Sequence, residues 1–148
     1  MKKLLGVSHQ SKNVDFILLL LRITIAALML THGLPKMEKL LSGDPIQFAS
    51  VFGLSPEVSL GLTVFSEVFC SILIFAGFGT RFAVIPLIIT MVVAAFVIHA
   101  ADPFAKQEMA IIYLIVYVVL LIGGSGRYSL DSLISSRTAF GRGELVKN

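Results

Sequence analysis

The sequence predicts an all-α integral membrane protein: a bundle of four transmembrane helices, with both termini cytoplasmic and a short interfacial helix in the first outer loop. Of its 148 residues, 56% are hydrophobic and only 14% are charged, whereas charged residues make up roughly a quarter of a soluble domain. The mean hydropathy is +0.91. Four apolar segments are each long enough to cross a hydrocarbon core of about 30 Å, which takes roughly 20 helical residues.

The four spans are expected to form one domain, 1–148, and to be helical because lipid offers no partner to an unpaired backbone group. They cover residues 14–34, 56–78, 81–100 and 103–123, and a cytoplasmic tail, 124–148, follows. Arg22 interrupts the first apolar run and no small-residue cleavage site ends it. We therefore expect a retained span rather than a cleaved signal peptide.

Local signals mark the ends of the later spans. Ser55 followed by Pro56 is typical of a helix N-cap with proline at the first helical position, and the pair Asp102-Pro103 predicts the same cap before the fourth span. Gly79-Thr80 predicts a helix stop followed directly by a new N-cap, so that the second and third spans form a tight hairpin.

The loop between the first two spans carries a helix signal of its own. Residues 44–47, Asp-Pro-Ile-Gln, resemble a capping box. They predict a short helix over residues 48–52 that stops at Gly53 and rests on the membrane surface or covers the bundle.

The distribution of lysine and arginine outside the spans predicts the orientation. Eight lie on the side of the termini: Lys2, Lys3, Lys12, Arg81, Arg127, Arg137, Arg142 and Lys147. Three lie on the other side: Lys36, Lys39 and Lys106. Both termini are therefore expected in the cytoplasm of a bacterial inner membrane. The net charge of +3 follows from this topology, and the absence of a basic stripe argues against nucleic-acid binding.

Arg22 and Glu67 are the charged residues expected deepest in the membrane. Counted from the cytoplasmic ends of the first two spans, they lie roughly 12 Å and 16 Å deep at 1.5 Å per residue. An isolated charge at such depth costs about 2.5–3.5 kcal/mol, so we predict that the two side chains pair. The pair is either a structural staple that fixes the register of two helices or a polar site that holds a head group or relays protons.

A second polar group is expected at the outer mouth of the bundle, where it could form an entrance to that site. It comprises His32, Lys36, His99 and Glu108. Its histidines and acids are spread over several segments without local ligand spacing, so no metal site is predicted. Interfacial polar residues in contact with water are the simpler interpretation.

Tyr113 and Tyr117 lie four residues apart and share a face of the fourth helix. They either stack on a flat ligand such as a quinone ring or pack in the core with their hydroxyls bonded. The single cysteine, Cys70, excludes an intramolecular disulfide and a C-x-x-C redox pair. The chain carries no Rossmann fingerprint, phosphate loop or nucleophile elbow, so no motif predicts an enzyme.

Taken together, several short segments resemble the DoxX family of small bacterial four-helix membrane proteins, from residue 19 to residue 133. They are Leu21-Arg22, 31–36 (Thr-His-Gly-Leu-Pro-Lys), Glu67 with 76–81 (Ala-Gly-Phe-Gly-Thr-Arg), His99-Ala100 and 124–131 (Gly-Ser-Gly-Arg-Tyr-Ser-Leu-Asp). The resemblance marks Gly33, Gly77, Arg81, Gly126 and Asp131 as positions of structural importance. Asp131 is expected to cap a short cytoplasmic helix.

The resemblance implies a function linked to quinones, sulfur oxidation or oxidative stress. On that basis we expect a membrane subunit of a redox system, with a quinone from the bilayer as its only cofactor and with redox or sulfur-metabolism proteins as partners. A small-molecule or proton transporter acting as a homo-oligomer is one alternative, since four helices are few for alternating access. A non-catalytic membrane scaffold is the other.

Overall fold

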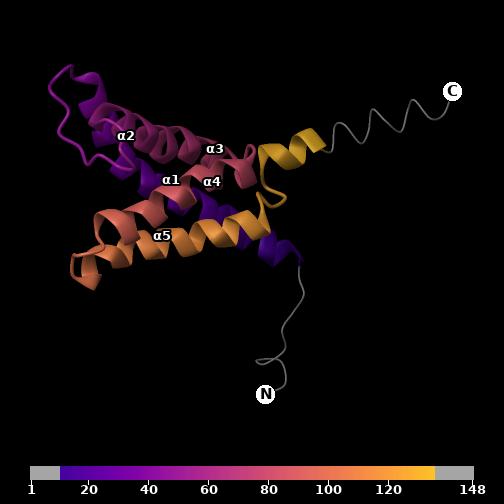
Figure 1. Cartoon of the computed structure of the whole chain (residues 1–148). Coiled ribbons are helices and arrows are strands. Elements are labelled where there is room, and N and C mark those ends of the chain that lie inside the picture. The colour runs from indigo at the N-terminus through magenta and orange to yellow at the C-terminus, as the bar shows by residue number, and fades with distance from the viewer. Residues whose placement is uncertain (1–10, 136–148) are drawn as a thin grey trace.

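A computed structural model describes residues 11–135, and within that range the chain is helical with no strand. Four helical spans cross the molecule: α1 (Ser11–Leu41); α2 (Pro56–Val64), η1 (Phe65–Cys70) and α3 (Ser71–Ala76) in line; α4 (Thr80–Val93) and η2 (Ala94–Ile98) in line; and α5 (Phe104–Gly123). Figure 1 shows them as long rods that lie side by side, with successive rods running in opposite directions. The predicted all-helical class and the four membrane-length helices are confirmed.

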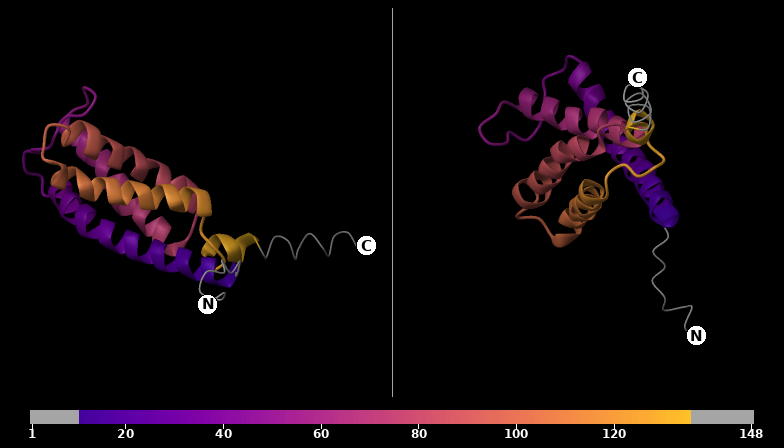
Figure 2. Two further views of the ribbon diagram at one scale, coloured as in Figure 1. Left: turned by 90° about the horizontal axis from the view of Figure 1, so that it is seen from below. Right: turned by 90° about the vertical axis from the view of Figure 1, so that its right-hand side faces the viewer.

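The spans close into a ring of neighbours. The second span packs against α1 and against α4, and α5 packs against α4 and α1. One end of the bundle, here the loop end, carries loop 42–55 and turn 99–103. The other, here the terminal end, carries the start of α1, turn 77–79 and segment 124–135 (Figures 1 and 2).

The outward faces of the bundle are apolar. Large hydrophobic side chains stand exposed on every span, among them Phe16, Phe69, Phe82 and Ile115. Such a continuous apolar surface suits lipid, whereas a soluble monomer rarely exposes more than a few hundred Å² in one patch. The chain is accordingly a multi-pass membrane protein.

The first span is longer than predicted. The expected end at Leu34 is wrong, because α1 continues through Pro35 to Leu41. Proline costs the helix one hydrogen bond, but Met37 and Leu40 beyond it pack against the second span, and this contact stabilises the extension.

The predicted interfacial helix is not formed, since residues 42–55 contain no helical turn. Ile46 and Phe48 turn their side chains onto the apolar cluster of the second span. Lys39 donates a hydrogen bond to the carbonyl of Gln47, and Phe52 adopts a φ of 53°. Tertiary contacts thus override the local capping signal.

The caps at the span ends differ from one another. Ser55 caps α2 as predicted, with its hydroxyl accepting from Val58 N at 3.4 Å. The second span ends at Ala76 rather than Phe78, because Gly77 takes a left-handed conformation with a φ of 71°. Asp102 does not cap α5, because its carboxylate instead contacts the side chains of His99 and Lys106.

The orientation remains a prediction. Lys2, Lys3, Arg137, Arg142 and Lys147, five of the eight residues that support it, lie outside the described residues. The other three, Lys12, Arg81 and Arg127, lie at the terminal end, and Lys36, Lys39 and Lys106 lie at the loop end.

Candidate functional site

Glu67 forms an ion pair with Lys36 in the loop-end half of the bundle. The Lys36 Nζ atom lies 2.6 Å and 2.7 Å from the two carboxylate oxygens. The Glu67 side chain is 3% exposed and the Lys36 side chain is 33% exposed. The carboxylate is therefore held inside the protein while the ammonium group reaches in from its rim.

Gly33 brings the two helices close enough for this pair. A Cβ atom at Gly33 would lie 2.9 Å from Glu67 Cβ and 2.8 Å from Val68 Cγ2, so only glycine fits without a shift. Small residues allow this close approach of membrane helices. Because Lys36 follows Gly33 by three residues, it lies on the same face of α1 as the contact.

The predicted pairing of Arg22 with Glu67 is wrong. Arg22 is buried, but it donates to Ser125 O at 2.6 Å and to Tyr128 O at 2.8 Å, at the terminal end. Its guanidinium lies against Gly77. Glu67, ten residues before Gly77, lies instead opposite Gly33, roughly 16 Å further along α1 at 1.5 Å per residue.

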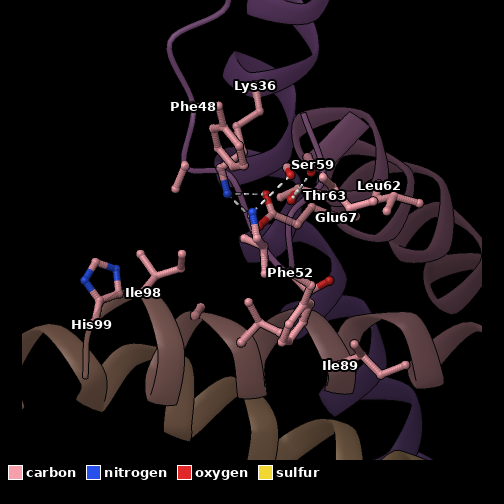
Figure 3. Close-up of a pocket in the computed structure, with 16 residues that line it drawn as sticks. Lys36, Phe48, Phe52, Ser59, Leu62, Thr63, Glu67, Ile89, Ile98 and His99 are labelled. Atoms are coloured by element: carbon pink, nitrogen blue, oxygen red, sulfur yellow. Dashed lines mark hydrogen bonds and ion pairs between the residues drawn. The ribbon is translucent and has the colours of Figure 1, made fainter. Parts of the chain in front are cut away.

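A cavity of about 370 Å³ opens beside the Lys36–Glu67 pair. Loop 42–55 contributes Phe48 and Phe52, and the second span contributes Ser59 and Thr63. Ile98 and His99 lie on the facing wall (Figure 3). The remaining lining is mostly aliphatic, so the pair is the charged feature of a largely apolar chamber.

A smaller cavity of about 140 Å³ adjoins the same pair. Both cavities share Lys36, Glu67, Ala94 and His99. The smaller one is further lined by Met29, His32, Met91, Lys106, Met109, Ala110 and Tyr113. The ion pair thus lines two adjoining cavities of different character.

Both interruptions of regular α-helix border these cavities. Glu67 lies within the π-helical segment η1, and η2 runs up to His99. The π turns widen their helices by a residue and are frequent at functional sites. A plain hydropathy pattern does not distinguish a π turn from α-helix, so neither segment was predicted.

Three of the four predicted entrance residues meet here. His32, Lys36 and His99 line the cavities, whereas Glu108 is exposed on α5 and lines neither. His99 Nδ1 lies 2.8 Å from a carboxylate oxygen of Asp102. This hydrogen bond, followed by that from Lys106, lowers the pKa of Asp102 below its usual value.

The two tyrosines have different environments. Tyr113 lines the smaller cavity and meets the ring of His32 edge-on, with centroids 5.9 Å apart. Tyr117 is fully buried and lines neither cavity, so for this residue the structure favours packing in the core, one of the two predicted alternatives. The aromatic residues at the larger cavity are Phe48 and Phe52, which sequence reasoning missed.

At the terminal end, the positions marked by the family resemblance hold segment 124–131 in place. Asp131 caps α4 by accepting from Gly79 N at 2.8 Å, and its own amide donates to Gly77 O. The predicted cap on its own helical turn is made by Ser129, whose hydroxyl accepts from Ser132 N.

Two further contacts complete this arrangement. Arg81 donates to Ile122 O at 3.2 Å. Gly126, with a φ of 68°, lies beside Asp15, whose carboxylate accepts from Arg127 N. A shallow cavity of about 430 Å³ lies between α4 and this segment. Within residues 11–135, no cluster of three or more histidine, cysteine or acidic residues is placed to bind a metal.

Comparison with known proteins finds one matching family model and two similar bacterial proteins. The family model described as DoxX matches residues 17–100. An uncharacterised protein of Haemophilus influenzae is 28% identical over 133 residues, covering 85% of this chain and 96% of that protein. A second uncharacterised protein of the same organism is 31% identical over 124 residues, covering 79% and 82%. No solved structure matches.

Proposed function

Because this chain belongs to the DoxX family, we propose that it is a quinone-binding membrane subunit of a redox system in the bacterial inner membrane, with the loop end facing outward. The single observation that carries the proposal is the buried Lys36–Glu67 pair on the wall of the larger cavity.

The chemistry of this cavity suits a neutral, lipophilic molecule with polar oxygen atoms. Its volume, about 370 Å³, lies within the range of small-molecule sites, which are mostly apolar with a few placed polar groups. Glu67 and Lys36 balance each other in charge, so a charged ligand gains nothing. A quinone carbonyl could accept a hydrogen bond from the Lys36 ammonium group.

The larger cavity also offers a flat ligand aromatic contacts, and its wall includes Leu62 and Ile89, which are 56% and 58% exposed on the outer faces of their spans. Phe48 and Phe52 lie on its loop side, and Phe52 is 79% exposed. Aromatic rings pack favourably on a planar π-system. We propose that the quinone ring occupies the chamber near these residues while its tail stays in lipid.

In this function the chain binds and protonates the quinone rather than supplying electrons. Reduction of a quinone to a hydroquinone takes two electrons and two protons. A partner protein from redox or sulfur metabolism provides the electrons, and Glu67 is the group placed to pass protons to the quinone oxygen.

The transport alternative finds less support in the packing. Ala26, Ile74 and Leu87 are all buried between the level of Glu67 and the terminal end. An apolar core of this kind opposes a continuous polar pathway, because moving a charge through it is costly. A scaffold role does not explain why a charged pair lies beside a cavity inside the bundle.

Binding of a short-chain quinone to the purified protein in lipid nanodiscs tests the proposal. We expect saturable binding that Glu67→Gln weakens by about tenfold or more, because the neutral amide no longer holds the Lys36 ammonium group that donates to the quinone carbonyl. Hydrogen bonds to charged groups are worth roughly 1.5–3 kcal/mol. Glu108→Gln, which alters an exposed carboxylate of α5 outside both cavities, is the matched control and should bind as the wild type does.

Thermal unfolding of each variant separates loss of binding from loss of fold. Failure of the wild-type protein to bind the quinone, or equal affinity of the wild type and Glu67→Gln, would overturn the proposal.

A further inference from the structure

The smaller cavity differs from the larger one in the groups that surround it. Titratable groups reach it from four elements: Lys36 and His32 on α1, Glu67 on η1, His99 at the end of η2, and Lys106 and Tyr113 on α5. Glu67 contributes the carboxylate. Such a concentration of polar groups in a small space favours water, which needs two to four polar partners to be held.

The smaller cavity lies toward the aqueous surface at the loop end. His32 and Lys106 on its wall are exposed residues. Lys106 also lies 3.2 Å from Asp102 in turn 99–103. The polar wall of this cavity is therefore continuous with the solvated turn between η2 and α5.

In the opposite direction the core is closed. Leu87, one helical turn from Met91 toward the terminal end, is fully buried, as are Ala26 and Tyr117. The nearest charged side chain beyond them is Arg22, which is held by the carbonyls of Ser125 and Tyr128. Among the described residues, Glu67 thus has charged and exposed polar groups toward the loop end, whereas toward the terminal end a packed core lies between it and Arg22.

We infer that the smaller cavity is a water-filled inlet through which the Glu67 carboxyl group exchanges protons with the aqueous phase at the loop end. In the exchange, the protonated carboxyl passes its proton to a water molecule, which leaves a carboxylate and a hydronium ion. Lys36 Nζ, 2.6 Å and 2.7 Å from the two oxygens, stabilises the carboxylate that forms.

This inference deepens the proposed function, on which its significance rests. The larger cavity would hold the quinone beside Glu67, while the smaller one supplies water to the same carboxyl group. Protons for the quinone would then come from, or return to, the loop-end solution only. The reaction would consume or release protons on one side of the membrane.

Substituted cysteines test the inlet without any quinone. Cys70 is the sole cysteine, so Cys70→Ser provides a background free of thiols. In it, Met91→Cys places a thiol on the wall of the smaller cavity, and Leu87→Cys places one on the same helix, one turn deeper and outside all three cavities. The two native residues are 5% and 0% exposed, which makes them a matched pair.

The probe is a small, charged, membrane-impermeant methanethiosulfonate. Thiols react as thiolates and only where water and reagent reach them, so we expect Met91→Cys to react at least roughly tenfold faster than Leu87→Cys. It should react from the same side as Ser50→Cys in the exposed loop 42–55, which fixes the side independently of the orientation.

Met29→Cys, on α1 and on the wall of the same cavity, is a second variant in case Met91→Cys does not fold, and the same preference is expected. Equal, slow reaction of the wall and core thiols would overturn the inference, as would labelling of the wall from the side opposite Ser50→Cys. If the thiols are labelled as expected but the protein binds no quinone, the inlet is supported and the proposed function is wrong.

Discussion

At the scale of single residues, the Lys36–Glu67 pair places a buried carboxylate in an apolar bundle. A buried carboxylate is stable only while its charge is compensated, and removing one partner of a buried pair commonly costs about 3–5 kcal/mol. Lys36 is one-third exposed, so it can return to solvent when Glu67 is lost. Glu67 is 3% exposed and cannot reach solvent when Lys36 is lost. Removing Lys36 should therefore destabilise the protein more than removing Glu67.

We predict that Lys36→Met destabilises the protein more than Glu67→Leu, by about 2 kcal/mol or more, and that the double variant is more stable than Lys36→Met alone. The double change replaces both charges by apolar side chains in an apolar setting. Unfolding by detergent titration measures all four proteins of this cycle. Additive effects would contradict a direct ion pair.

Arg22 has a different task. Its guanidinium satisfies the carbonyls of Ser125 and Tyr128 and thereby fixes segment 124–131 across the terminal end. Arg22→Met leaves both carbonyls without that partner, at a cost of about 1–3 kcal/mol for a buried unsatisfied group. We predict faster proteolysis of segment 124–135 and unchanged quinone binding. A variant with intact segment protection and lost binding would place Arg22 in the ligand site instead.

At the scale of helices, the contact between α1 and η1 depends on Gly33. Gly33→Ala would force its new Cβ against Glu67 and Val68, and overpacking of this kind costs about 1–3 kcal/mol. We predict a less stable protein in which the Lys36–Glu67 geometry is disturbed and quinone binding is weakened. Thermal unfolding and the nanodisc binding assay measure the two effects.

Gly61→Ala is the control for this prediction. Gly61 lies in α2, and nothing lies within 4 Å of the position its Cβ would occupy. Alanine there should be neutral or stabilising, by about 0.5–1 kcal/mol, because glycine carries an entropic cost in a helix. Equal destabilisation by both substitutions would argue against a specific close approach at Gly33.

Hydropathy sufficed to predict the four spans because membrane helices are specified by length and composition. Register was not predictable in the same way. The estimate that placed Arg22 and Glu67 at one depth assumed that neighbouring spans end level with each other, whereas the Gly33 contact sets a different offset. Phe48 and Phe52 were missed because a local capping signal predicted a helix that tertiary packing excludes.

The buried polarity of Glu67 and the position of Lys36 could be anticipated, since a charge in an apolar span requires a partner. Sequence alone could not identify Lys36 rather than Arg22 as that partner, because this depends on how far α1 is shifted along its axis relative to the second span. The π turns at Glu67 and before His99 add one residue to a helical turn without changing its composition, so no sequence pattern indicates them.

At the scale of the whole molecule, the direction in which the bundle crosses the membrane decides which compartment Glu67 exchanges protons with. Positive residues concentrate on the side of the termini, and cytoplasmic loops carry the excess of lysine and arginine. We predict that a fluorescent protein fused after Asn148 is fluorescent in cells. We also predict that alkaline phosphatase inserted at Ser50, in the exposed loop 42–55, is active, because that enzyme folds only in an oxidising compartment. The reverse pattern would show that the termini lie outside the cytoplasm. The site with its two cavities would be unchanged, but Glu67 would then exchange protons with the cytoplasm.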